Sequence, residues 1–437
     1  MKLPTFIQQT AVLLSSLVIG HSSFSAEPID LPTALHLAGA RNLDVQFARE
    51  KATEARAAHQ AALMSFFPWL APAVGYRGHS GLAQNTDGSI IDADKHLATY
   101  GPALIAQVDL GDAIYKRLAT RQLSQAAEAA AEAQRQDAIM LAAVLYFDLV
   151  QSQAAERIAA DAVKVAQDYA RQLGSAVETG VALKGDSLRA QVQTDKARLL
   201  FQQAVAQRRL AAARLATHLH LDAAIELAAR DADLAPLTLF ADKSTSLGAL
   251  IAQAKARPEL AQSQALAEAA AAQRDGAKYG PLIPVVSGNA GIGGLTGGID
   301  GGSNRSGDTA DYGIALTWRI GPGGLFDRSR TDTAESRLRQ AQIQQAKTGD
   351  TIVAQVIEAH TRVRSLREQT TTATAALATA QQALALAEQR NEFGIAAVLD
   401  RITALQDLVA ARLAHATVLA EYNKAQYLLR RAAGGGG

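Results

Sequence analysis

Length, composition and charge limit the kinds of protein that this chain can be. It has 437 residues, with 43 Lys and Arg against 42 Asp and Glu, so no basic excess is present to gather the phosphates of a nucleic acid. It contains no cysteine, which excludes disulfides, thiolate metal sites and a cysteine-linked lipid. Aromatic residues make up only 5%, and alanine-rich segments are frequent, so the composition favours long, closely packed helices over a compact core.

The N-terminal segment, residues 1–25, has the pattern of a secretory signal peptide. Lys2 is followed by the apolar run Ala11 to Gly20 and then by small residues around Ser25. Outside this segment no window of about 20 apolar residues is evident, so we expect no transmembrane helix in the mature protein. Any part that spans a membrane must then be built from strands.

The first half of the mature chain, residues 26–221, predicts a helix, a β-hairpin and two long helices. The first helix runs from Leu31 to Met64, and the hairpin spans residues 66–110 with a long polar loop between its strands. The helical segment 112–221 contains no proline and few glycines before Gly174, which predicts a rod on the order of 90 Å long. A rod of this length is unusual in a globular domain.

The second half repeats this plan after a connector at residues 222–246. Ala249-Leu250 corresponds to Ala34-Leu35, an offset of 249 − 34 = 215 residues. The second repeat covers residues 247–431, with a hairpin at 282–320, a glycine-rich loop inside it, and long helices over 327–431. The remaining residues 432–437 are expected to form a flexible tail.

The predicted strands are amphipathic, with apolar side chains alternating with small or polar ones. In the strand after Asp311, Tyr312 and four further apolar residues occupy every second position up to Ile320. A GPGG break then precedes Asp327, which is placed to cap the next helix. The apolar side of the strands is expected to face lipid. The residues assigned to it are Leu104, Val108, Ile314, Leu316 and Trp318.

Four strands in one chain cannot close a barrel, and in a bilayer an open edge leaves backbone groups without partners at several kcal/mol each. Three copies would supply a closed barrel of twelve strands, with three sets of rods forming a helical tube below it. The alternative is an ordinary soluble sandwich with its aromatics in the core. Four strands separated by long rods supply too little sheet for that alternative.

Two short breaks between the long helices share a motif. Gly180 and Asp186 are separated by five residues, and Gly394 and Asp400 repeat this spacing at an offset of 394 − 180 = 214. Each glycine permits a chain reversal, and each Asp either caps the next helix or places a carboxylate in a narrow lumen. With both repeats and all four strands in order, the chain resembles the outer membrane factor family of TolC-like outer membrane efflux proteins.

The resemblance implies an α+β membrane protein that forms a homotrimer in the bacterial outer membrane and extends through the periplasm. It implies a channel, not an enzyme, that passively conducts substrates in a tripartite efflux or type I secretion system. A periplasmic adaptor and an inner-membrane transporter of the resistance-nodulation-division or ABC type are the implied partners, with no cofactor and no nucleic acid. The alternative function is a soluble periplasmic coiled-coil adaptor or scaffold, which would not need two amphipathic hairpins.

Two further motifs contain residue types that can form ligand sites. His218 and His220 are two residues apart, so on a helix they would point to different sides, and solvated histidines are favoured over a metal site. The run GIGGLTGG at residues 291–298 lacks the GxGxxG spacing of a phosphate loop and has no helix directly after it. An extracellular loop is the preferred interpretation of this run.

Overall fold

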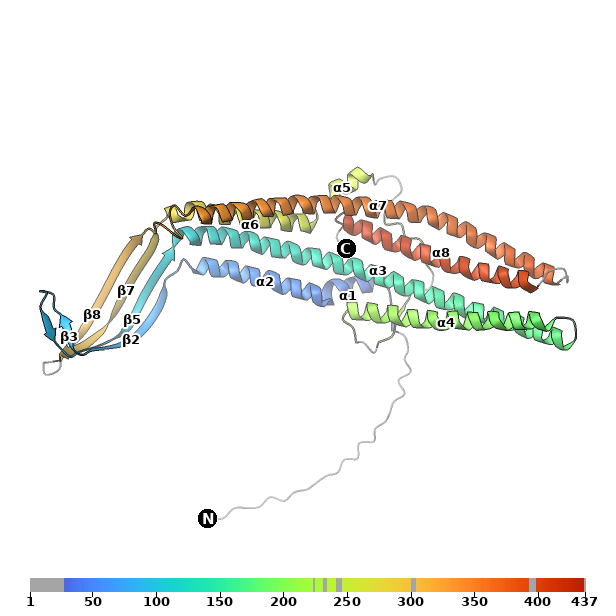
Figure 1. Ribbon diagram of the computed structural model, residues 1–437, viewed down its shortest axis with the longest axis horizontal. Coiled ribbons are helices and arrows are strands. Elements are labelled where there is room, and N and C mark those ends of the chain that lie inside the picture. Colours follow the sequence, from blue (N-terminus) through green and yellow to red (C-terminus); the bar gives the residue numbers. More distant parts are fainter. Residues whose placement is uncertain are drawn as a thin grey trace, which may run out of the picture.

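The protein is elongated, with a β-sheet at one end and long helices that extend from it (Figure 1). This computed structural model describes residues 27–222, 225–230, 234–240, 246–299, 304–392 and 398–435. The predicted signal peptide lies outside the described residues. The arrangement agrees with the predicted α+β fold of strands joined to long rods.

Four long helices form two hairpins that point away from the sheet. The first hairpin joins α3 (Leu110–Glu178) to α4 (Lys184–His218), and the second joins α7 (Arg328–Glu392) to α8 (Val398–Ala432). Figure 1 shows the two tips side by side at the end of the molecule opposite the sheet. The 69-residue length of α3 gives a rod on the order of 100 Å.

Each repeat also contributes a short helix followed by a longer one. These are α1 (Leu31–Arg41) with α2 (Leu43–Met64), and α5 (Leu247–Ala254) with α6 (Pro258–Tyr279). The single helix predicted from Leu31 to Met64 is therefore wrong at Asn42. The side chain of Asn42 accepts hydrogen bonds from the backbone N–H groups of Asp44 (2.9 Å) and Val45 (3.3 Å), and so begins a new helix.

The sheet contains four antiparallel strands in the order β2, β5, β7, β8. The strands are β2 (Trp69–His79), β5 (Lys95–Asp109), β7 (Val285–Ile299) and β8 (Arg305–Thr317). The first hairpin loop carries a small ribbon of β3 (Leu82–Gln84) and β4 (Ile90–Asp92). A separate parallel pair joins β1 (Glu27–Ile29) to β6 (Leu227–Ala229), so the connector between the repeats pairs with the first described strand.

The glycine-rich segment predicted as a loop is mostly strand. Both β7 and β8 extend through it, and the connection between them begins after Ile299. The glycines are needed because β5 passes very close. A Cβ on Gly294 would lie 2.3 Å from Cζ of Tyr100, and a Cβ on Gly293 would lie 2.1 Å from the carbonyl oxygen of Tyr100. Glycine here permits close packing of strands instead of loop flexibility.

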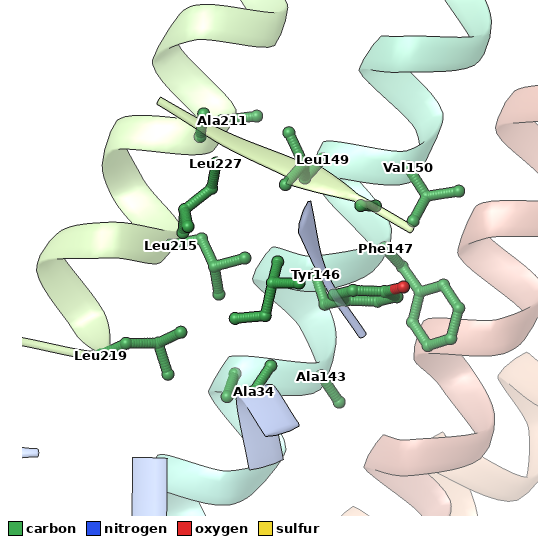
Figure 2. Packing of buried hydrophobic residues seen from close by; sticks show 14 of the residues in the cluster. Ala34, Ala143, Tyr146, Phe147, Leu149, Val150, Ala211, Leu215, Leu219 and Leu227 are labelled. Carbon is green, nitrogen blue, oxygen red and sulfur yellow. The ribbon is translucent and has the colours of Figure 1, made fainter. Parts of the chain in front are cut away.

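The largest apolar core lies midway along the helices, where both repeats meet (Figure 2). Tyr146 and Leu149 of α3 pack against Leu215 of α4, Leu227 of β6 and Ala34 of α1. Full burial of each large apolar side chain stabilises the fold by about 1.5 to 3 kcal/mol. A second core joins α5, α7 and α8 in the corresponding place.

One described helix, α3, contains an 18-residue window that could cross a membrane by length and apolar composition. This differs from the expectation that no such window follows the N-terminal segment. Half of the window is buried inside the protein. The apolar core around Tyr146 accounts for this composition.

The predicted flexible tail is wrong at residues 432–435. Ala432 and Ala433 are buried, and the N–H groups of Gly434 and Gly435 donate to the carbonyl groups of Arg431 and Arg430. Gly434 has a φ of 83°, which closes the end of α8 in the left-handed conformation that glycine favours.

Candidate functional site: sheet faces and helix tips

The register of the sheet divides its side chains into an apolar face and a polar face. Leu104 of β5 lies opposite Leu70 of β2 and Ala290 of β7, and Ala290 in turn lies opposite Tyr312 of β8. Directly opposed residues point to the same side of a sheet, so these residues share one face. Ile314, in the same alternation, is 81% exposed in the single chain. An apolar face left open to this extent requires a lipid or protein surface to cover it.

The opposite face carries mostly small and polar side chains, with a few larger apolar ones such as Ile105 and Leu295. Thr317, Ala315 and Asp311 of β8 lie on it, together with Asn289 and Ser287 of β7. The sheet therefore has one face suited to hydrocarbon and one suited to water.

One of the residues predicted to face lipid departs from that prediction, and another lies at the very end of the sheet. Val108 shares the apolar face through its pairing with Val286, but it is only 7% exposed, because the sheet meets the helices there. Trp318 lies just beyond the end of β8, and its indole N–H donates to the carbonyl oxygen of Leu282 over 3.3 Å. The expected lipid contact of Val108 is therefore wrong, and Trp318 belongs to the junction between sheet and helices.

Among the described strands, the two outer ones of this sheet, β2 and β8, each have one neighbour. Each strand therefore presents one edge of backbone N–H and C=O groups without a partner strand. Such an edge pairs with another chain or is covered in a stable protein.

The first helix tip contains the predicted motif at Gly180 and Asp186. Gly180 has a φ of 79°, a left-handed conformation that glycine adopts without strain. A glycine is therefore needed where the chain reverses between α3 and α4. Asp186 is not the N-cap: that position is Leu183, which makes no side-chain capping bond. The Asp186 carboxylate lies in the first turn, 3.4 Å from Nη1 of Arg189, where a negative charge stabilises the helix start.

The second tip contains Gly394 and Asp400. Gly394 lies outside the described residues. Asp400 is the third residue of α8 and its side chain is exposed. The structure thus places both carboxylates in the first turn of the returning helix, at the two tips that Figure 1 shows side by side.

A contact that sequence reasoning missed joins the two tips within one chain. The guanidinium of Arg401 lies over the ring of Tyr169, 4.2 Å from its centroid, and 3.5 Å from the Glu388 carboxylate. Ile402 packs beside it in an apolar cluster with Leu173. The burial of Tyr169 raises the pKa of its hydroxyl, against the opposing effect of the Arg401 charge. The two hairpins are therefore held together near their ends.

A buried ion network links the C-terminal end of α8 to the middle of the molecule. Glu259 accepts from Arg431 and, over 2.5 Å, from Nη2 of Arg257, while Nε of Arg431 donates to Asp137 over 2.8 Å. Burial alone would raise the pKa of Glu259, but the hydrogen bonds from the two arginines hold it at about 2. A cavity of about 330 Å³ lies beside this network. Because its charged groups pair with one another, we assign the network a structural role.

The two histidines weighed as ligands are separated by the end of α4. His218 is partly buried, with Nε2 2.8 Å from the carbonyl oxygen of Ala138 and Nδ1 3.4 Å from the Asn42 amide nitrogen. His220 lies beyond the helix with a φ of 53°. His218 is thus a packing residue and not the solvated histidine that the sequence predicts. No group of three potential metal ligands occurs in the described part of the chain.

Comparisons with known proteins agree with this combination of a sheet and long helical hairpins. The family model described as "Outer membrane efflux protein" matches residues 250–435. No curated protein sequence matches the chain.

Solved structures share the fold over almost the whole chain at low identity. The outer membrane protein VceC from Vibrio cholerae is 20% identical with a TM-score of 0.79, covering 93% of this chain and 96% of its own. The CmeC outer membrane channel of Campylobacter jejuni is 19% identical with a TM-score of 0.80, covering 100% and 94%. The open state of the MtrE outer membrane channel of Neisseria gonorrhoeae is 18% identical with a TM-score of 0.73, covering 94% and 90%.

Proposed function

We propose that this protein is an outer membrane efflux channel, because residues 250–435 match the outer membrane efflux protein model and the whole chain shares the fold of outer membrane channels. The match of residues 250–435 to this family model agrees with the family that the sequence resembles. The channel conducts solutes passively from the periplasm to the exterior, and the energy for transport comes from an inner-membrane pump. Passive conduction depends on the shape of the lumen and on the charge of the side chains that line it, and it needs no catalytic group.

One observation carries this proposal: an open sheet with an apolar face, a polar face and two unpaired edges stands at the end of long helices. In a bilayer the edges must be closed by other strands, since unpaired backbone groups cost several kcal/mol each in hydrocarbon. A soluble adaptor would have no use for a sheet of this kind. The fold therefore favours the channel over the adaptor alternative.

Closure by further copies of the same chain gives the assembly. Strand β2 runs away from the helices and β8 runs back toward them, so β8 of one copy can pair antiparallel with β2 of the next. A ring of three copies supplies three times four, or twelve, strands, within the range of known barrels. The polar face then lines the lumen and the apolar face meets lipid.

The helices below the edge strands offer matching apolar side chains. Phe47 of α2 is exposed 17 residues from Met64, and Ile343 of α7 is exposed 15 residues from Arg328. At about 1.5 Å per residue both lie roughly 25 Å below the sheet. Neighbouring copies would bring these two side chains to the same level and cover them.

Outer membrane efflux channels work with periplasmic adaptors and inner-membrane pumps. For this chain the helix tips with Gly180, Asp186, Gly394 and Asp400 are the proposed docking end. A pump of the resistance-nodulation-division or ABC type would deliver the solute there. The Asp186 carboxylate lies 3.4 Å from Nη1 of Arg189, which limits the negative field that it creates.

Cysteine cross-linking tests the ring directly, since the natural chain contains no cysteine. Ala71→Cys in β2 would be combined with Asp311→Cys, Gly313→Cys or Ala315→Cys in β8, all on the polar face. A register that brings two Cα atoms within about 7 Å permits a disulfide. We expect one pair to give a covalent product of three chains and no larger species.

The matched control is Ala71→Cys with Ala103→Cys, because these residues are opposite each other within one chain. This pair should oxidise without any gain in mass. A ladder that stops at two chains, or grows beyond three, in the β2–β8 pairs would contradict the three-membered ring.

A further inference from the structure

Basic side chains gather on the polar face at the end of the sheet farthest from the helices. Arg77 of β2 lies in one row with Leu97, Gly297 and Arg305 of β8. In the next row outward, Lys95 of β5 lies opposite His79. With strands about 4.8 Å apart, Arg77 and Arg305 stand roughly 14 Å from each other on one face. We call Arg77, Lys95 and Arg305 the mouth cluster.

The alternation along each strand fixes the side to which the mouth cluster points. Arg305 is six residues from Asp311, and Arg77 is six residues from Ala71, so both arginines share the face of those two residues. This is the polar face and not the face of Leu104 and Tyr312. The cluster therefore points into the space that the proposed channel encloses.

No ion pair or side-chain hydrogen bond to the mouth cluster is present among the described residues. Three carboxylates of this end, Asp87, Asp92 and Asp94, belong to the β3–β4 ribbon and its flanks, outside the rows of the sheet. The Asp87 carboxylate already accepts bonds from the backbone N–H (3.0 Å) and hydroxyl (2.6 Å) of Ser89.

Among the described residues, one further carboxylate at this end faces away from the cluster. Asp308 lies on the apolar side, because it pairs with Gly294 in the row of Tyr100. Asp300 lies outside the described residues. On the polar face of β8, the first acid inward from Arg305 is Asp311, about 20 Å away at 3.3 Å per residue.

We infer that the mouth cluster is an anion-attracting ring at the external exit of the lumen, and that the solutes it favours carry carboxylate or phosphate groups. This inference rests on the proposed function, because three copies bring three times three, or nine, cations to one opening. Guanidinium groups bind carboxylate and phosphate groups with paired hydrogen bonds, and a confined opening of one charge sign concentrates the opposite ions. Neutralising the ring should then weaken anion binding at the exit.

Polyanion block in planar bilayers tests this inference. The purified full-length protein would be inserted into phosphatidylcholine bilayers free of lipopolysaccharide, with inositol hexakisphosphate added to one side at a time. We expect stronger block from the mouth side, and a rise of at least about 10-fold in the half-blocking concentration for Arg77→Gln with Arg305→Gln. The double change to Lys keeps the charge and should retain most of the block. Arg337→Gln with Arg339→Gln, which removes the same two charges from α7, should leave it unchanged.

Three other outcomes would overturn the inference. Equal block of the wild type and the Gln variant from the mouth side would mean that the cluster does not meet permeating anions. Block that is equal from both sides would place the anion site elsewhere. Unchanged block together with loss of co-purifying lipopolysaccharide from the Gln variant would assign the cluster to lipid phosphates. An absence of any conductance in the wild type would instead refute the proposed function, so the two failures are distinguishable.

Discussion

The pairing of Glu259 with two arginines makes the strongest prediction about what holds the helices together. Glu259 lies near the start of α6. Its carboxylate forms ion pairs with Arg257, two residues earlier, and with Arg431 in the last turn of α8. The side chain of Arg431 is only 7% exposed. Glu259→Gln would leave two guanidinium groups with less compensating charge in a largely buried place.

The expected cost follows from the structure in two ways. Breaking a buried ion pair by removing one partner typically costs about 3 to 5 kcal/mol, because the remaining charge stays buried. A fall in the Glu259 pKa from 4.5 to about 2 corresponds to about 3 kcal/mol of stability. The two routes agree in order of magnitude. Asp137 still faces Arg431 over 2.8 Å, so the lower end of the first range is expected.

The sign of the pH dependence is set by the lowered pKa. The unfolded carboxyl binds a proton near pH 4.5, whereas the folded one stays ionised to about pH 2. Its contribution is therefore complete above pH 4.5 and is lost as the pH falls through that interval. The stability difference between wild type and Glu259→Gln should be largest near neutral pH and should shrink toward pH 2.

Denaturation of the detergent-solubilised protein, followed by helical circular dichroism at pH 7 and pH 3, measures this difference. Glu128→Gln is the matched control, since Glu128 pairs with Arg56 over 2.7 Å but both side chains are about half exposed. An exposed pair contributes under about 1 kcal/mol. Equal midpoints for the two variants at pH 7, or a gap between Glu259→Gln and wild type that widens in acid, would refute the reasoning.

Three further predictions concern the sheet and the tips. Tyr312→Arg, halfway along β8 on the apolar face, should cost about 2 to 4 kcal/mol, and Asp311→Arg on the polar face should cost much less; equal losses of assembled protein would contradict the assigned faces. An epitope inserted at Gly301, between the strands β7 and β8, should bind antibody on intact cells. Antibody binding only after permeabilisation of the outer membrane would show that this connection faces the periplasm. Asp400→Ala should reduce cation selectivity in bilayer recordings if its carboxylate faces the lumen, whereas an unaltered reversal potential with a lowered melting temperature would limit Asp400 to stabilising the helix start.

The repeat, the amphipathic strands and the long helices could be predicted because each depends on local pattern. Alternation around Ile314 and the proline-free run after Asp112 need no knowledge of distant residues. Asp327 was likewise recognisable as a cap, and its carboxylate accepts from the N–H groups of Gly323 (2.9 Å) and Arg330 (3.2 Å).

The features that were missed depend on contacts between segments far apart in the chain. Gly293 and Gly294 signal a loop by composition, and only the ring and backbone of Tyr100 on β5 show why a strand needs them. The stacking of Arg401 on Tyr169 joins residues more than 200 positions apart. Glycines at the C-terminus predict a flexible tail, although Gly434 ends α8 and packs beside the side chain of Arg257. In each case the partner, and not the residue itself, determines the structure.

Imaging of the intact assembly tests the central claim most directly. The protein would be extracted from outer membranes in detergent, purified without cross-linking, and imaged as single particles. The account predicts a three-fold particle with a twelve-stranded barrel in the detergent belt and a hollow helical stalk that ends at the tips. A particle that stays in solution without detergent, or that lacks a closed barrel formed by β2 and β8 of neighbouring copies, would contradict it.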